Sequence, residues 1–169
     1  MYFNKLFFYL ACLFVLFSPA GFTAEIEFET DTTVNSDSLD HRAKFLASDV
    51  TLTNNAEISH TKGSGDVIQS AATTGTPLTN LTLINNNGAT LRMGGQRDIV
   101  IDFEHVDDSS IINSGLLKTN DQIVIKLSNT NNITVINNVT GRLESERNSI
   151  LCTADGSGSC TNPTIINSG

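Results

Sequence analysis

The chain has 169 residues, a formal net charge of −8 at pH 7, no tryptophan and only 17% charged residues. This length allows one domain, and the acidic balance disfavours nucleic acid and anionic lipid as partners. The small share of charge, together with many asparagine, threonine, serine and glycine residues, agrees with a turn-rich all-β chain.

Residues 1–24 have the pattern of a secretory signal peptide. Lys5 supplies a positive charge, residues 6–17 form an apolar core, and a break at residues 18–21 precedes the expected cleavage after Ala24. Twelve apolar residues are too few to cross a hydrocarbon layer of about 30 Å, which argues against a membrane anchor. We therefore expect an exported protein, in the periplasm, at the cell surface or outside the cell, with no transmembrane segment in the mature chain.

The stretch 25–47 is predicted to be an N-terminal cap. Residues 25–29 alternate glutamate with Ile26 and Phe28, a pattern that suits a strand with charge on its exposed face. Three apolar residues at helical spacing within residues 39–48 predict one short capping helix.

A degenerate repeat fills residues 48–169. Each copy places apolar residues in alternate positions and then an asparagine, and these asparagines lie 31, 28, 24 and 30 residues apart. They are Asn54, Asn85, Asn113, Asn137 and Asn167. A period in this range is typical of stacked coils, and the alternation predicts strands with one buried face. We therefore predict a parallel β-helix of about four to six coils, each stabilised by its neighbours.

The recurring asparagine is predicted to form a structural ladder, because a side-chain amide can both donate and accept a hydrogen bond. Replacing Asn113 by alanine should then lower the free energy of unfolding by about 1–3 kcal/mol. Gly88, Gly115 and Gly141 follow the asparagines and indicate tight corners with positive φ. A further apolar segment closes several of the units, so each unit is expected to contain a strand, a corner, a strand, a loop and a strand.

Two cysteines remain after the leader, and a polar, glycine-rich loop separates them. In an exported chain, Cys152 and Cys160 are expected to form a local disulfide. Closing such a short loop should contribute about 2 kcal/mol or less. A metal site is the alternative, but no histidine lies nearby. We predict no metal and no cofactor.

An acidic stretch is the best candidate for chemistry. It contains Asp98, Asp102, Glu104, His105, Asp107 and Asp108. Paired carboxylates are what glycosidic hydrolysis requires, and carboxylate oxygens also suit calcium. The alternative, which we favour, is structural: Asp98, Val100 and Asp102 occupy the outward positions of a strand, and Asp107 and Asp108 belong to a turn.

The leader and the coils together resemble the amino-terminal part of a bacterial autotransporter passenger of type V secretion. The segments that carry the resemblance are LTLINNNGATL (81–91), DIVIDF (98–103), SIINSGLL (110–117) and ITVINNVTGRL (133–143). The resemblance implies an adhesin-like right-handed parallel β-helix with sparse, local cysteines. It also implies secretion through a carboxy-terminal outer-membrane β-barrel, which displays the passenger on the cell surface.

The barrel strands that such a family requires are absent from this chain, which stops within a repeat at Gly169. We therefore expect a truncated passenger with an uncapped C-terminus. The predicted function is that of a secreted or surface-exposed adhesin or stalk fragment without catalytic activity, whose partner is a host-surface or cell-surface glycan or protein. The alternative is a polysaccharide lyase or glycoside hydrolase that uses the acidic cluster Asp98–Asp108.

A templating surface, such as one that binds ice, is a third possible role for a solenoid. It would need regular Thr-x-Thr ladders. In the sequence, Thr51-Leu52-Thr53 and Thr82 do not recur in register, and this argues against a templating role.

Overall fold

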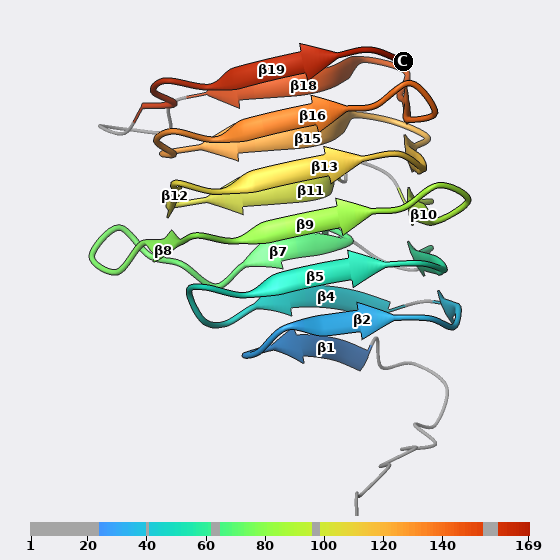
Figure 1. The fold of residues 1–169 in the computed structure, drawn as a ribbon, viewed down its shortest axis with the longest axis horizontal. Helices are drawn as coiled ribbons and strands as arrows, with labels where there is room; N and C mark the ends of the chain where they lie inside the picture. Colours follow the sequence, from blue (N-terminus) through green and yellow to red (C-terminus); the bar gives the residue numbers. More distant parts are fainter. Residues whose placement is uncertain (1–23, 40, 62–64, 96–98, 154–158) are drawn as a thin grey trace, which may run out of the picture.

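The computed structural model describes residues 24–39, 41–61, 65–95, 99–153 and 159–169. Residues 1–23 of the predicted leader (1–24) therefore lie outside the described residues. The described chain contains strands and no helix, and most of these strands stack in parallel sheets, as Figure 1 shows. The prediction of an all-β chain with parallel sheets is thus confirmed.

Three sheets run along the stack. The first sheet consists of β1 (Ala24–Phe28), β4 (His41–Phe45), β7 (Ile68–Ser70), β11 (Ile99–Glu104), β15 (Ile123–Ser128) and β18 (Asn148–Thr153). The second sheet consists of β2 (Thr32–Val34), β5 (Thr51–Asn54), β9 (Thr82–Asn85), β13 (Ser110–Asn113), β16 (Thr134–Asn137) and β19 (Thr164–Asn167). The third sheet consists of β3 (Ser38–Leu39), β6 (Glu57–His60), β10 (Thr90–Met93), β14 (Leu116–Thr119) and β17 (Arg142–Glu144). Two short strands, β8 (Leu78–Thr79) and β12 (Val106–Asp107), pair with each other.

The chain visits the second, third and first sheets in turn, as in β5, β6 and β7. Every pairing between the named strands is parallel, so each coil lies on the one before it. This arrangement is consistent with a parallel β-solenoid, in which each coil is stabilised mainly by its neighbours.

Alternating burial explains why these segments are strands. In β5, β9, β13 and β16 the second and fourth residues are buried and the first and third are not. The inward aliphatic side chains Leu52, Leu83, Ile111 and Val135 are at most 1% exposed. Phe45 packs between Phe28 and Phe103, with ring centroids 5.8 and 6.0 Å apart. Removing this apolar surface from water is the main favourable contribution to the fold.

The capping helix predicted within residues 39–48 is wrong. β4 occupies half of this stretch, pairs with β1 and β7, and buries Ala43 and Phe45 completely. The helical spacing was misleading because pairing with neighbouring strands outweighs a weak local pattern. The stretch 25–47, predicted to be an N-terminal cap, contains strands that belong to the same three sheets as the coils.

One column that looked out of register in the sequence is in register in the structure, whereas Thr53 pairs with Ile84, so the Thr-x-Thr pattern of β5 does not recur in the strands that follow it in this sheet. Thr51 pairs with Thr82, Thr82 with Ser110, Ser110 with Thr134, and Thr134 with Thr164. The sequence hides this alignment because the corners and loops differ in length, so the spacing varies from 24 to 31 residues.

Candidate functional site

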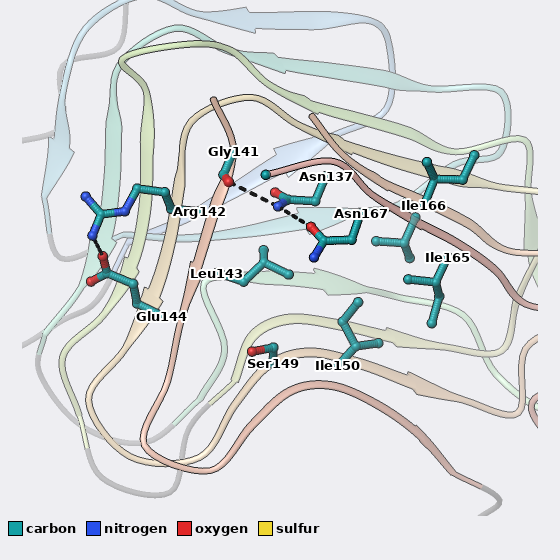
Figure 2. A pocket seen from close by; sticks show the side chains of 12 residues that line it. Asn137, Gly141, Arg142, Leu143, Glu144, Ser149, Ile150, Ile165, Ile166 and Asn167 are labelled. Carbon is teal, nitrogen blue, oxygen red and sulfur yellow. Dashed lines mark hydrogen bonds and ion pairs between the residues drawn. The ribbon is translucent and has the colours of Figure 1, made fainter. Parts of the chain in front are cut away.

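The five asparagines of the repeat lie in one column inside the stack. Nδ2 of each donates to Oδ1 of the next, from Asn54 to Asn85 (2.9 Å), Asn113 (2.8 Å), Asn137 (2.7 Å) and Asn167 (2.8 Å). The first four side chains are at most 5% exposed. Figure 2 shows the last step of this asparagine ladder. Because water cannot replace these bonds in the interior, the amides depend on one another.

Each of the first four asparagines also holds the corner that follows it. Asn113 accepts a hydrogen bond from the backbone N–H of Gly115 (3.2 Å) and donates to the carbonyl oxygen of the same residue (3.1 Å). Asn137 instead reaches the carbonyl of Gly141, four residues on, at 3.0 Å. The same side chain therefore closes short and long corners, which lets coils of unequal length stack in register.

Glycine is needed at these corners for two different reasons. Gly88 has a φ of 84°, as expected for a tight corner. Gly115 and Gly141 are not among the positive-φ residues, so for them that prediction is wrong. A Cβ on Gly115 would overlap the carbonyl oxygen of Ala89, and a Cβ on Gly141 would overlap the carbonyl oxygen of Asn113, both in the preceding coil. These two positions are glycine because the neighbouring coil approaches the backbone closely.

A second polar column, which was not predicted from the sequence, lies at the opposite end of the same strands. Asp49, Asn80, Asp108, Asn132 and Asn162 all have φ between 48° and 60°. Asn80 donates to Asp49 and Asn132 to Asp108, both over 2.8 Å. Asparagine and aspartate tolerate this left-handed conformation better than other non-glycine residues. This column could have been found in the sequence, because each of its five residues lies five positions before an asparagine of the ladder.

A hollow of about 560 Å³ lies at the last coils of the described chain, and Figure 2 shows its lining. Its floor is apolar and includes Val135, Leu143 and Ile150, while Asn167 and the ion pair of Arg142 with Glu144 contribute polar groups. Ile165 occupies the inward position of β19 and is 50% exposed there. The hollow is therefore the uncovered inner face of a coil and contains no convergent set of catalytic groups.

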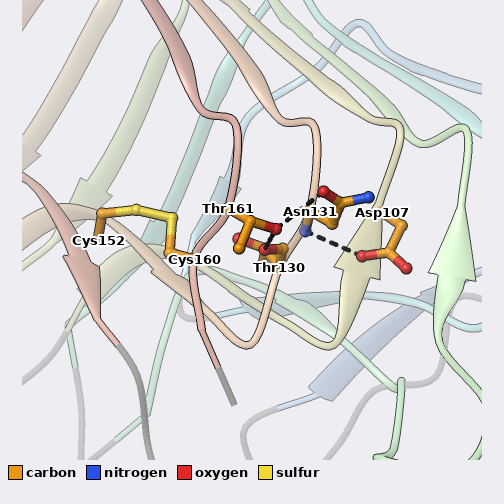
Figure 3. The surroundings of a disulfide bond; sticks show 6 residues. All are labelled: Asp107, Thr130, Asn131, Cys152, Cys160 and Thr161. Atoms are coloured by element: carbon orange, nitrogen blue, oxygen red, sulfur yellow. Dashed lines mark hydrogen bonds between the residues drawn. A yellow bond between two sulfur atoms is a disulfide. The ribbon is translucent and has the colours of Figure 1, made fainter.

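Cys152 and Cys160 are joined by a disulfide, with their Cα atoms 5.7 Å apart, as Figure 3 shows. Cys160 packs against the hydrophobic core, whereas Cys152 is exposed. Next to it, Thr161 donates to Oδ1 of Asn131 at 2.8 Å, and Oδ1 of Asp107 accepts from the N–H of Asn131 at 2.9 Å. The disulfide thus ties the loop of the last coil to a column of corner hydrogen bonds.

The acidic stretch does not form one site. Asp98 lies outside the described residues. Asp107 and Asp108 hold the corner towards the following coil, where Oδ1 of Asp108 accepts from Nδ2 of Asn132 at 2.8 Å. Val100, expected to point outwards, is fully buried, because the strict alternation breaks at the start of β11.

Asp102 and Glu104 lie on the outer face of the first sheet, in a small polar hollow of about 180 Å³ that Asp66, Gln69 and Ser70 also line. Burial, and next the negative charge of Asp66, raise the pKa of Asp102 to about 6, although Lys126 lies 3.4 Å from its Oδ2 and opposes the shift. Its Oδ1 is buried and has no hydrogen-bond partner in the structure. Asp102 therefore holds a proton more readily than an ordinary aspartate does.

No group of three or more histidine, cysteine, aspartate or glutamate side chains placed to hold a metal ion occurs in the described parts of the chain. Within the same residues, no helix is long and apolar enough to cross a membrane.

The parallel sheets define the class of the protein, an all-β chain of stacked coils consistent with a β-solenoid. No family model, curated protein or solved structure matches the chain, so this class rests on the structure itself.

Proposed function

We propose that this chain is an exported, right-handed parallel β-helix that acts as an adhesin or stalk, similar to the amino-terminal part of an autotransporter passenger. It binds a glycan or a protein of a host or cell surface through its exposed faces, and it catalyses no reaction itself. In this proposal the leader delivers the chain out of the cytoplasm, and a translocating β-barrel displays it at the cell surface.

The observation that carries the proposal is the continuous stacking of the coils. The asparagine ladder runs from Asn54 to Asn167 without interruption and keeps the second sheet in register throughout. Such a rod presents repeated side chains along its length, which suits contact spread over a surface. The short loop that the Cys152–Cys160 disulfide closes agrees with export, where disulfides form and persist.

Export is tested first, by fusing residues 1–24 to an alkaline phosphatase that lacks its own signal peptide. We expect phosphatase activity in the periplasm, because this enzyme folds only after its disulfides form. Replacing Leu10 and Leu13 by arginine would interrupt the apolar core, and this variant is the matched control. Equal activity of the control, or no activity of the original fusion, would contradict the export proposal.

Binding is tested with the purified full chain on immobilised glycans and on epithelial cells, with heat-denatured protein as the control. Saturable binding by the folded chain alone is expected. A crystal structure would decide the hand of the coils, and left-handed coils would contradict the likeness to passengers.

A second candidate function rests on Asp102. A carboxyl group with a raised pKa in a hollow beside Asp66 and Glu104 has the protonation state that a general acid needs below pH 6. The chain would then act on a polysaccharide. Release of reducing ends or unsaturated uronates by the wild type, and loss of this activity in Asp102→Asn, would favour an enzyme over an adhesin. No activity of the wild type would exclude this alternative on the substrates tried.

A further inference from the structure

The outer face of the second sheet carries two aligned columns of side chains. The first residues of its strands form a hydroxyl column, which consists of Thr51, Thr82, Ser110, Thr134 and Thr164. The third residues form a neighbouring column, which consists of Thr53, Ile84, Ile112, Ile136 and Ile166. In β5, β9, β13 and β16 these positions are half-buried, because they point outwards while their neighbours along the strand fill the core.

This face is neutral, whereas the other two sheets carry charge. No strand of the second sheet, as the structure describes it from β2 to β19, contains a charged residue. By contrast, Lys126 pairs with Asp102 on the first sheet, and Lys118 pairs with Glu144 on the third sheet at 3.0 Å. Although the chain has a net charge of −8, the charged side chains that the structure describes lie on the other sheets and in the loops. The second sheet therefore lacks the charged groups whose dehydration costs the most free energy.

The face is also rigid and regular. Buried bonds of the asparagine ladder fix the end of each strand from the inside, and the exposed amides of Asn55 and Asn86 bond to one another across the coils at 2.6 Å. Parallel pairing repeats each hydroxyl about every 4.8 Å along the stack. Figure 1 shows β5, β9, β13 and β16 lying one above another along this sheet. Side chains held in this way lose little conformational freedom on binding.

The area and the side chains of this face limit the kinds of partner that can bind to it. Five strands of four residues cover roughly 300 Å², far less than the roughly 800 Å² per partner that a stable protein interface buries. A second copy of the chain is therefore disfavoured. The outward positions contain no aromatic ring, which is the usual platform for the apolar face of a sugar. What remains is a neutral, extended lattice of hydroxyl groups.

We infer that this neutral face of the second sheet binds the surface of ice. Each threonine or serine hydroxyl both donates and accepts a hydrogen bond, as each lattice water does. The isoleucine side chains of the neighbouring column and the threonine methyl groups are apolar and require no hydrogen bonds. Many weak contacts made together by a rigid array give useful affinity for a repeating surface. This inference is independent of the adhesin proposal, because it needs neither a receptor nor surface display.

The test is an ice-recrystallisation assay on the purified full chain, compared with an equal mass of serum albumin. We expect the chain to keep ice grains small at concentrations where albumin does not. Thr134→Lys places an ammonium group in the centre of the hydroxyl column, and it should raise the required concentration at least about tenfold, because this charge loses water at the lattice. Val139→Lys is the matched control, since this loop side chain is 78% exposed and lies outside both columns.

A second variant keeps the test decisive if Thr134→Lys fails to fold. Thr134→Val preserves the shape of the side chain and removes only the hydroxyl group, and it should weaken the inhibition while circular dichroism stays unchanged. A wild type no better than albumin would overturn the inference, as would equal loss in the Val139→Lys control. Binding to crystalline cellulose without binding to ice would overturn it as well, and would assign the face to a polysaccharide.

Discussion

Replacing Asn113 by alanine tests whether the buried amide ladder stabilises the stack. The substitution removes the bond to Oδ1 of Asn137 (2.7 Å), the bond from Nδ2 of Asn85 (2.8 Å) and the pair of bonds to the backbone of Gly115 (3.1 and 3.2 Å). The side chain is 1% exposed, so water cannot replace them. At about 1 kcal/mol for each bond, the free energy of unfolding should fall by about 3 to 4 kcal/mol, at or above the upper end of the range expected from the sequence.

Urea unfolding followed by circular dichroism measures this loss as a lower midpoint with an unchanged slope. Asn55→Ala is the matched control, because Asn55 is exposed and donates to Oδ1 of Asn35 at 2.8 Å in the corresponding outer row. Water can take over the bonds of this outer side chain, so the control should lose less than about 1 kcal/mol. Equal losses in the two variants would refute the reasoning, since burial would then make no difference to the value of an amide ladder.

Three further substitutions test other parts of the stack. Gly115→Ala should lower the free energy of unfolding by about 2 to 3 kcal/mol, because the added Cβ would meet backbone oxygens of the neighbouring coil. A thermal melt measures this loss. Gly75→Ala is the control and should change the stability little, because the space around Gly75 is open. Asp102→Asn should stabilise the fold by about 1 to 3 kcal/mol at pH 8 and by almost nothing at pH 4. The reason is that the folded pKa of about 6 lies above the unfolded value of 3.8, so the wild type loses stability as the pH rises between them; a difference that does not depend on pH would contradict this. Cys160→Ser should cost about 2 kcal/mol or less, since the disulfide spans only eight residues, and reducing the wild type should give the same loss.

Much of the fold could be predicted from local patterns. Alternating apolar residues next to a recurrent asparagine define a strand with one buried face, wherever in the chain they occur. That is why β5, β9, β13 and β16 could be placed in advance. The disulfide could also be predicted from the sequence, because only two cysteines follow the leader and they lie close together in the chain.

The acidic stretch shows the opposite case. Six polar side chains within eleven residues look like one cluster in the sequence. The turn at His105, whose φ is 53°, separates Asp102 on the first sheet from Asp107 and Asp108 at the corner. Asp66, which comes from the preceding coil, completes the hollow around Asp102 instead. Proximity along the chain therefore did not indicate proximity in space.

The strands, the recurrent asparagine and the neutral composition of the strands that carry it can be read from the sequence alone, because these are local properties of side chains. The register depends on contacts between coils and is visible only in the folded structure. Corners and loops of unequal length conceal in the sequence that Thr51, Thr82, Ser110 and Thr134 lie side by side. Hydrogen bonds between coils align the strands, and this alignment converts scattered hydroxyl groups into one continuous column.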